Sequence, residues 1–138
     1  MRAIFANSLD FWSRSQWALD SAQPLQTQKL HGLTICIETP QYGLRQGKGW
    51  MSAAPADYGY IADTIGADGD EVDCYVGPSP ESKKIFIVDQ NRLDGSGEFD
   101  EHKIVFGCGS KDEAKQLYLD GHTEGEQIFR AISPVSVE

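Results

Sequence analysis

The chain of 138 residues has few basic residues, few cysteines and no long apolar run. Lysine and arginine total 12 against 21 aspartates and glutamates, and the net charge of −9 argues against a nucleic-acid backbone or an anionic membrane as partner. No apolar run approaches the roughly 20 residues of a membrane span, and no signal-peptide pattern is present, so we expect a cytoplasmic protein. The three cysteines, Cys36, Cys74 and Cys108, lack CxxC spacing, which predicts reduced core residues rather than a disulfide framework or a zinc site.

Length and composition predict one folded domain with an additional N-terminal segment. A chain of 138 residues fits one core, and a hydrophobic content of 40% is ordinary for a folded protein. Residues 1–27 are set apart by apolar and aromatic residues at loosely helical spacing, followed by a connector. We therefore expect a partly helical arm at 1–27, which docks on the domain or on a second copy of the chain, and a domain at 28–138.

The rest of the chain has the pattern of short strands separated by glycine-rich turns. Leu33, Ile35 and Ile37 alternate with polar residues, which predicts a strand over residues 30–38 with Glu38 on the face opposite the apolar stripe. Further strands are expected at 58–65, 72–76, 83–90 and 98–105, with a hairpin turn at 91–97. The pattern therefore predicts a mainly β (α+β) fold, a small and highly curved barrel of five or six strands.

One late helix is expected after these strands. Ser110 is a good N-cap, Glu113 completes a capping box with it, and Gly121 is a natural stop. The C-terminal residues 133–138 resemble the cap of a further helix.

Three carboxylates, Asp68, Asp70 and Asp73, fall within six residues, and Gly69 permits a tight bend between the first two. Hard divalent cations such as Mg²⁺ prefer oxygen ligands, and an acidic turn held between two strands can direct several at one point. An EF-hand is excluded, because the sixth position from Asp68 is Asp73 instead of glycine and the twelfth is Ser79 instead of glutamate. The alternative is a solvated hairpin.

A glycine-rich loop at 40–49 carries Arg45 and Lys48 as its only cations. Glycine allows the backbone to approach an anion, arginine can bind phosphate oxygens in a bidentate manner, and lysine acts as a point charge. The two side chains are therefore candidates for a phosphate clamp, and a solvated pair of cations is the alternative.

Two motifs identify a resemblance. The segment Tyr-Gly-Tyr-Ile at 58–61, followed by Asp-Gly-Asp-x-x-Asp at 68–73, resembles the signature of soluble (family I) inorganic pyrophosphatases, with Glu71 where those enzymes usually carry proline. The runs at 55–60 and 99–103 are closer still to a shorter pyrophosphatase-like domain of bacteriophage and prophage proteins. The resemblance covers roughly residues 28–138. It implies an OB-like closed β-barrel with the site in its mouth, in a phage- or prophage-encoded protein acting in the cytoplasm of a bacterial host.

The resemblance also implies a function, which is Mg²⁺-dependent hydrolysis of inorganic pyrophosphate with two or more ions per site. A later family motif, Asp-x-x-x-x-Asp-x-Lys, fits at Lys103, but its acid positions fall on Glu101 and Ser96, so neighbouring acids can stand in for them. Tyr118 matches the tyrosine of a Tyr-Lys pair, with Leu119 in place of the lysine. The implied catalytic residues are Asp70 as general base, Lys103 and Tyr58; the implied substrate-binding residues are Arg45, Lys48 and Tyr118; the implied metal ligands are Asp68, Asp73, Asp100, Glu101, Glu38, Asp94 and Asp89.

Two other functions remain compatible with the sequence. The altered second motif and the missing lysine are compatible with a catalytically weakened module that binds phosphate-containing ligands or serves as a phage structural piece. A hydrolase acting on the pyrophosphate bond of a nucleotide is the third possibility.

Overall fold

A seven-stranded sheet, in the order β1-β2-β5-β6-β8-β7-β9, organises this computed structural model, which describes residues 26–122 and 124–135. The strands of this sheet are β1 (Gln26–Leu30), β2 (Leu33–Thr39), β5 (Asp57–Ile61), β6 (Val72–Val76), β7 (Ile85–Asn91), β8 (Phe99–Phe106) and β9 (Phe129–Val135). A separate hairpin consists of β3 (Leu44–Gly47) and β4 (Trp50–Ala53). The two helices of the described part are α2 (Lys111–Asp120) and the short α3 (Gly125–Ile128). The expected mainly β fold is confirmed.

Neighbouring strands of the sheet are antiparallel except for β6 and β8, which are parallel. The parallel pairing sets Asp73 of β6 opposite Lys103 of β8, and Tyr75 opposite Val105. On the other side of β8, Gln90 of β7 lies opposite Glu101. Polar residues from three strands are thereby brought side by side.

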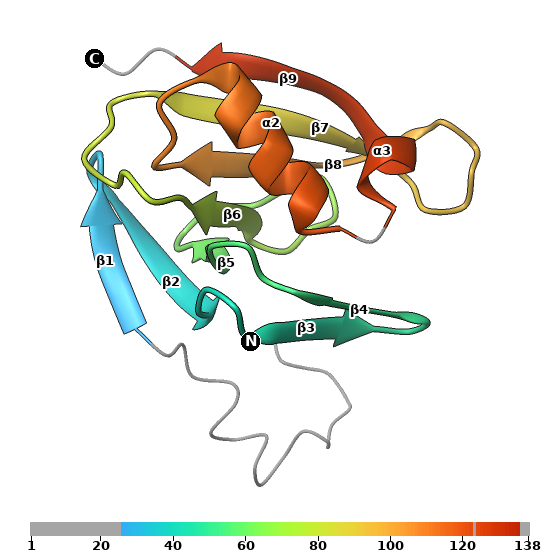
Figure 1. Ribbon diagram of the computed structural model, residues 1–138, viewed down its shortest axis with the longest axis horizontal. Coiled ribbons are helices and arrows are strands. Elements are labelled where there is room, and N and C mark those ends of the chain that lie inside the picture. The colour runs from blue at the N-terminus through green and yellow to red at the C-terminus, as the bar shows by residue number, and fades with distance from the viewer. Residues whose placement is uncertain (1–25, 123, 136–138) are drawn as a thin grey trace, which may run out of the picture.

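The sheet separates two apolar clusters. One contains Tyr75, Val88 and Val105 together with buried residues of α2, which lies across the β7–β8 part of the sheet (Figure 1). The other contains residues of β2, β5, β6 and β8, including Ile35 and Ile37. All three cysteines are free and buried, as expected.

The expected helix is confirmed as α2. The Ser110 hydroxyl accepts a hydrogen bond from the backbone N–H of Glu113, and the Glu113 carboxylate accepts one from the N–H of Gly109. Gly121 ends the helix with an ordinary φ of −85°, so conformational freedom does not explain the glycine. The reason is space, because a Cβ at Gly121 would collide with the hydroxyl of Tyr75.

The glycine of the Tyr-Gly-Tyr motif is explained in the same way. A side chain at Gly59 would run into the backbone carbonyl of Cys36 on the neighbouring strand β2. Close approach of β5 to β2 therefore requires glycine at this position.

The prediction of a closed barrel is wrong. Within the described residues β1 pairs with β2 alone and β9 with β7 alone, so both are edges of an open sheet. The sequence of β1, QTQKL, is mostly polar and exposed, and β9 contains Pro134, which has no N–H to donate to a further strand. Residues 133–138 resemble a helix cap in the sequence, but residues 133–135 belong to β9. The arm expected at 1–27 lies outside the described residues except for Gln26 and Thr27 of β1.

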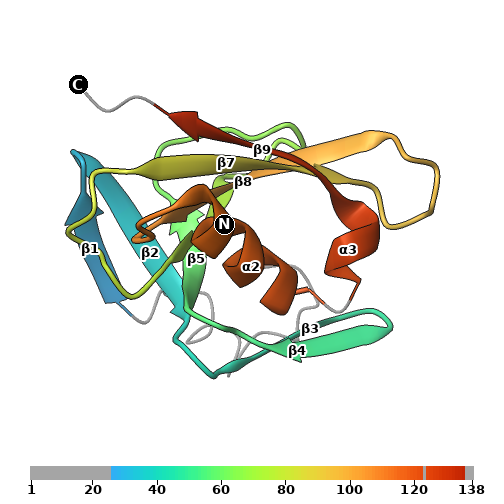
Figure 2. The ribbon, with the colours of Figure 1, turned by 45° about the horizontal axis from the view of Figure 1, so that its top comes forward.

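Three projecting segments lie at one end of the molecule. These are the β3–β4 hairpin, the β7–β8 turn and α3, which extend towards the same side in both views (Figures 1 and 2). None of the helices described is long and apolar enough to cross a bilayer.

Candidate active site

The face of the sheet that lies under α2 continues beyond the helix into a cavity. On β8, Val105 is in the core under α2, while Lys103 and Glu101, two and four residues earlier, line the cavity. The same change from apolar to polar occurs between Val88 and Gln90 on β7. Because side chains on a strand point to one face every second residue, the strands that form the core also place the polar side chains of the site.

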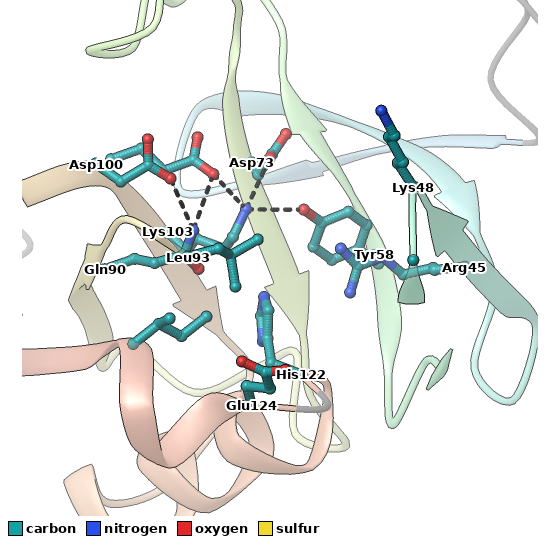
Figure 3. Close-up of a pocket in the computed structure, with 13 residues that line it drawn as sticks. Arg45, Lys48, Tyr58, Asp73, Gln90, Leu93, Asp100, Lys103, His122 and Glu124 are labelled. Carbon is teal, nitrogen blue, oxygen red and sulfur yellow. Dashed lines mark hydrogen bonds and ion pairs between the residues drawn. The ribbon is translucent and has the colours of Figure 1, made fainter. Parts of the chain in front are cut away.

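Lys103 is the centre of this polar group (Figure 3). Its Nζ donates hydrogen bonds to Asp73 Oδ2 at 2.9 Å, to Glu101 Oε2 at 2.9 Å and to the Tyr58 hydroxyl at 3.1 Å. The Lys103 side chain is 4% exposed, against 25% for Asp73 and 16% for Glu101. One buried cation therefore holds two carboxylates and a phenol in fixed positions.

The charges of this group stabilise one another. Burial by itself lowers the pKa of Lys103, but Tyr58, Asp73 and Glu101 raise it well above its ordinary value, so the ammonium stays protonated. Burial raises the pKa of Glu101, and the charges of Asp73 and Asp68 add to this increase against the opposing effect of Lys103. Burial likewise raises the pKa of Tyr58, which remains a hydrogen-bond donor.

A further series of hydrogen bonds, which begins at Tyr118 on α2, orients the carboxylates of Asp100 and Glu101. The Tyr118 hydroxyl donates to Gln90 Oε1 at 2.8 Å, which leaves the Gln90 amide group to donate to Asp100 at 3.2 Å and to Glu101 at 3.4 Å. Tyr118 is fully buried on α2 and lies behind Gln90, outside the lining of the cavity. Its contact with the site is therefore made through Gln90.

Arg45 is fixed against the body of the protein from the β3–β4 hairpin. Its guanidinium lies 3.7 Å from the centre of the Tyr58 ring and donates to the Tyr75 hydroxyl at 3.0 Å and to the Gly121 carbonyl at 3.3 Å. Ser52, directly opposite Arg45 in the hairpin, donates to the same carbonyl at 3.1 Å. These contacts attach the hairpin to the end of α2, and Lys48 in the hairpin turn remains exposed at the cavity.

The cavity has a volume of about 460 Å³ and is bounded by all three projecting segments. Its lining includes three cationic side chains and four carboxylates. The lining residues are Arg45, Lys48, Gly49, Tyr58, Asp73, Gln90, Leu93, Asp100, Glu101, Lys103, His122, Glu124 and Ile128. The structure thus brings together seven of the residues singled out in the sequence, namely Arg45, Lys48, Tyr58, Asp73, Asp100, Glu101 and Lys103.

The first two acids of the central motif lie in the exposed turn between β5 and β6, outside the cavity lining. Gly69 has a φ of +92°, and the Asp68 carboxylate accepts a hydrogen bond from the N–H of Asp70 at 3.0 Å. The charge of Asp68 nevertheless contributes to the raised pKa of Glu101. Asp68 is therefore electrostatically linked to the cavity, and Asp70 lies next to it on the exposed turn.

The other three predicted ligands are also outside the cavity lining. Glu38 is exposed on β2. Asp89 on β7 forms an ion pair with His102 at 2.8 Å. Asp94 is in the β7–β8 turn, where hydrogen bonds from Ser96 and Arg92 lower its pKa to about 2. None of the three lines the cavity.

Five residues of the cavity lining were not predicted from the sequence, namely Gln90, Leu93, His122, Glu124 and Ile128. Gln90 could have been found from its strand, because Phe86, Val88 and Gln90 share one face and a glutamine that continues a buried apolar stripe needs polar partners. His122 follows the glycine that ends α2, and nothing in the local pattern distinguishes it from a surface histidine.

His122 is expected to make the protein less stable in acid. Burial lowers the pKa of His122 to about 4, so in the folded protein the ring stays neutral while in the unfolded chain it protonates near its ordinary value. The unfolded state therefore binds more protons as the pH falls from about 6.5 towards 4, and the free energy of unfolding decreases by roughly 2–3 kcal/mol over that window. Urea denaturation from pH 7 to pH 4 measures this decrease, and His122→Asn, which does not titrate, should lack this component. Identical pH dependence of the two proteins would contradict the assignment.

The carboxylates of the cavity have the chemistry of a Mg²⁺ site. Asp73, Asp100 and Glu101 offer only oxygen donors, the ligand type that Mg²⁺ prefers. Burial raises the pKa of Glu101, and repulsion from Asp73 and Asp68 adds to this increase; a bound dication relieves repulsion of this kind. Within residues 26–122 and 124–135, no three acidic, histidine or cysteine side chains are already gathered closely enough to hold an ion. The residue types therefore suit Mg²⁺, and in this structure Lys103 is the counter-charge of Asp73 and Glu101.

A comparison with models of protein families agrees with the motifs. The sequence model of a family described as Inorganic Pyrophosphatase matches residues 22–138. Among solved structures, the chain is similar to the inorganic pyrophosphatase of the pathogenic bacterium Helicobacter pylori, with 18% identity and a TM-score of 0.46, over 79% of this chain and 88% of that one. No curated protein matches the chain.

Proposed function

The chain belongs to the inorganic pyrophosphatase family, and from this premise we propose that it hydrolyses inorganic pyrophosphate to two phosphates with Mg²⁺ as cofactor. The observation that carries the proposal is the position of Lys103, which is buried between Asp73, Glu101 and Tyr58 at the wall of a cavity that also presents Arg45. Cations and carboxylates in one cavity suit a substrate that is an anion and arrives with a metal ion.

The proposed ligands of Mg²⁺ are Asp73, Asp100 and Glu101 of the cavity, joined by Asp68 of the neighbouring turn. We propose two or more Mg²⁺ ions per site, because the negative charge of four carboxylates exceeds the positive charge of a single Mg²⁺ ion. For Glu38, Asp89 and Asp94 the ligand role stays a prediction. When bound, Mg²⁺ supplies Lewis-acid chemistry, which neutralises phosphate charge and lowers the pKa of water.

The residues of the chain would bind and orient the substrate. Arg45, held by the Tyr58 ring and the Tyr75 hydroxyl, would bind one phosphoryl group, with Lys48 adding positive charge at the entrance. The permanently charged Lys103 and the neutral Tyr58 hydroxyl would stabilise negative charge that develops on the leaving phosphate. Tyr118 would act through Gln90 by fixing the carboxylates, so its predicted substrate contact becomes a positioning role in this proposal.

Asp70 is proposed as the general base, by analogy with the middle acid of the family motif. Asp70→Asn keeps the shape of the side chain and removes the base, so we expect kcat to fall by roughly 10²–10⁴-fold. Asp63→Asn is a matched control, because Asp63 is exposed in the same loop and has a φ of +62°, which asparagine tolerates. Equal rates for the two variants would remove Asp70 from the mechanism.

The substrate is tested directly by ³¹P NMR. Purified protein is mixed with Mg²⁺ and, in separate samples, with pyrophosphate, ADP or ATP, and the products are followed over time. We expect conversion of pyrophosphate to inorganic phosphate and much slower change of the nucleotides. Preferred cleavage of a nucleotide would support the alternative of a nucleotide hydrolase. No turnover by folded protein with Mg²⁺, Mn²⁺ or Zn²⁺ would leave the catalytically weakened module as the function.

The proposal extends to the biological setting predicted from the motifs. The run at 99–103 and the compressed loop at 40–49 support the shorter bacteriophage and prophage type of domain, acting in the cytoplasm of the bacterial host. Neither nucleic acid nor membrane is a proposed partner, in keeping with the charge of −9. Association of two chains through residues 1–27 is proposed from their aromatic content, and gel filtration of the full chain beside a chain lacking them tests it.

A further inference from the structure

His122 has a fixed position at the wall of the cavity opposite the carboxylates (Figure 3). Its Nδ1 lies 3.0 Å from the carbonyl oxygen of Tyr118. The centre of its ring is 4.3 Å from the centre of the Tyr118 ring. It is 6.2 Å from the centre of the Tyr75 ring, in an edge-to-face arrangement. Two fully buried aromatic side chains and a backbone hydrogen bond therefore hold the imidazole in one orientation.

The hydrogen bond also fixes the tautomer. A carbonyl oxygen only accepts, so Nδ1 must carry the proton and donate it to Tyr118. In a neutral imidazole the other nitrogen, Nε2, is then an acceptor with a free lone pair. Burial, together with the nearby charges of Lys103 and Arg45, favours the neutral ring.

This acceptor has no partner of its own. Nε2 of His122 is shielded from solvent and forms no hydrogen bond with any described residue. A buried polar atom without a partner costs free energy, and such atoms are rare in folded proteins. Glu124, drawn beside His122 in Figure 3, adds a second acceptor to the same wall and no donor. A ligand at this wall must therefore bring a hydrogen-bond donor.

We propose that His122 binds the proton-bearing oxygen of inorganic phosphate, so that the cavity distinguishes phosphate from sulfate. The inference rests on the proposed function, because phosphate is the product of the proposed reaction. The charged half of the cavity, with Arg45 and Lys48, binds the unprotonated oxygens, and Nε2 of His122 accepts a hydrogen bond from the P–OH group. His122 is in this account a binding residue for the proton-bearing end of the product.

Sulfate is the appropriate comparison for this interaction. At pH 8 the main form of inorganic phosphate has one proton and two negative charges, whereas sulfate has the same charge and tetrahedral shape without a proton. The cations of the cavity are expected to bind the two anions equally well, because their charge and shape are the same. Sulfate, however, places an unprotonated oxygen against the lone pair of Nε2, which leaves the buried nitrogen unsatisfied. A site built to receive a hydroxyl rejects an analogue that lacks it, and we expect phosphate to bind roughly 10- to 100-fold more tightly than sulfate.

The experiment is calorimetric titration of the full chain with inorganic phosphate and with sulfate at pH 8, with and without Mg²⁺. His122→Asn retains an amide that can donate to the Tyr118 carbonyl and lacks the acceptor at the Nε2 position. His122→Gln can place an amide oxygen near that position. His31→Asn is the control, because His31 is exposed in the β1–β2 turn with a φ of +52° that asparagine tolerates. Circular dichroism and thermal denaturation establish that each variant is folded.

The expected result is a preference for phosphate in the wild type and in His31→Asn, its loss in His122→Asn, and its partial recovery in His122→Gln. Equal affinities of the wild type for the two anions, or no measurable binding of phosphate, would overturn the inference. So would a preference that survives in folded His122→Asn but disappears in Glu124→Gln. The titration needs no turnover, so a preference for phosphate in a protein that does not cleave pyrophosphate would refute the proposed function and leave the assignment of His122 standing.

Discussion

Replacing Lys103 with methionine is expected to lower the free energy of unfolding by about 3–5 kcal/mol, because two largely buried carboxylates lose their counter-charge. Methionine retains the length and the apolar stem of the lysine, so little packing is lost with the charge. Asp73 and Glu101, whose side chains are 25% and 16% exposed in the wild type, would lose the ammonium group that binds both. In the same variant the rate of phosphate release from pyrophosphate should fall by roughly 10³-fold or more. The variant also removes the fixed positive charge proposed to stabilise the leaving group.

Urea denaturation at pH 7 measures the stability of this variant, with Lys84→Met as its control. Lys84 is exposed and donates a single hydrogen bond to the carbonyl of Gly109, so its replacement should change stability by less than about 1 kcal/mol. If Lys103→Met were as stable as the control, the description of Lys103 as the centre of the site would be wrong.

Asp73→Asn is expected to weaken Mg²⁺ binding by at least roughly 10-fold and to lower phosphate release by about 10³-fold or more. The variant replaces a charged oxygen with an amide at the one carboxylate of the central motif that lines the cavity. Glu101 and Asp100 are proposed ligands in their own right, held in place by Lys103 and Gln90, so neither replaces the oxygen lost at Asp73.

Calorimetric titration with Mg²⁺ alone gives a readout that does not depend on turnover. Asp120→Asn is the matched control, because Asp120 is an exposed acid at the end of α2 that accepts a hydrogen bond from Gln116. Unchanged Mg²⁺ affinity of Asp73→Asn relative to this control would exclude Asp73 as a ligand.

Local patterns in the sequence predicted the parts of the fold that depend on neighbouring residues. The capping residue Ser110 and the stop at Gly121 were predicted from helix chemistry, and the structure has both. The common face of Glu101 and Lys103 follows from the period of a strand. The turn between β7 and β8 likewise follows from the composition of residues 91–97.

Long-range pairing decided the features that the sequence did not reveal. Nothing in the local pattern predicts the parallel pairing of β6 with β8, which sets Asp73 opposite Lys103. The prediction of a closed barrel was wrong for a similar reason. Alternating apolar and polar residues define strands, but they do not show which edges of the sheet remain open. Arg45 was recognised as a cation, but its fixed position depends on Gly121, which lies 76 residues later in the chain. The three acids of the central motif were grouped by spacing, whereas in the structure Asp73 lines the cavity and Asp68 and Asp70 are outside its lining.

The most direct test of the account is the initial rate of phosphate release from Mg²⁺-pyrophosphate, measured side by side for the wild type, Asp73→Asn and Asp120→Asn. We expect rapid release by the wild type and by Asp120→Asn, and a rate lower by about 10³-fold or more for folded Asp73→Asn. Equal rates for Asp73→Asn and the wild type would place the reaction outside this cavity. Absence of release from the folded wild type would contradict the central claim that this member of the family is a pyrophosphatase.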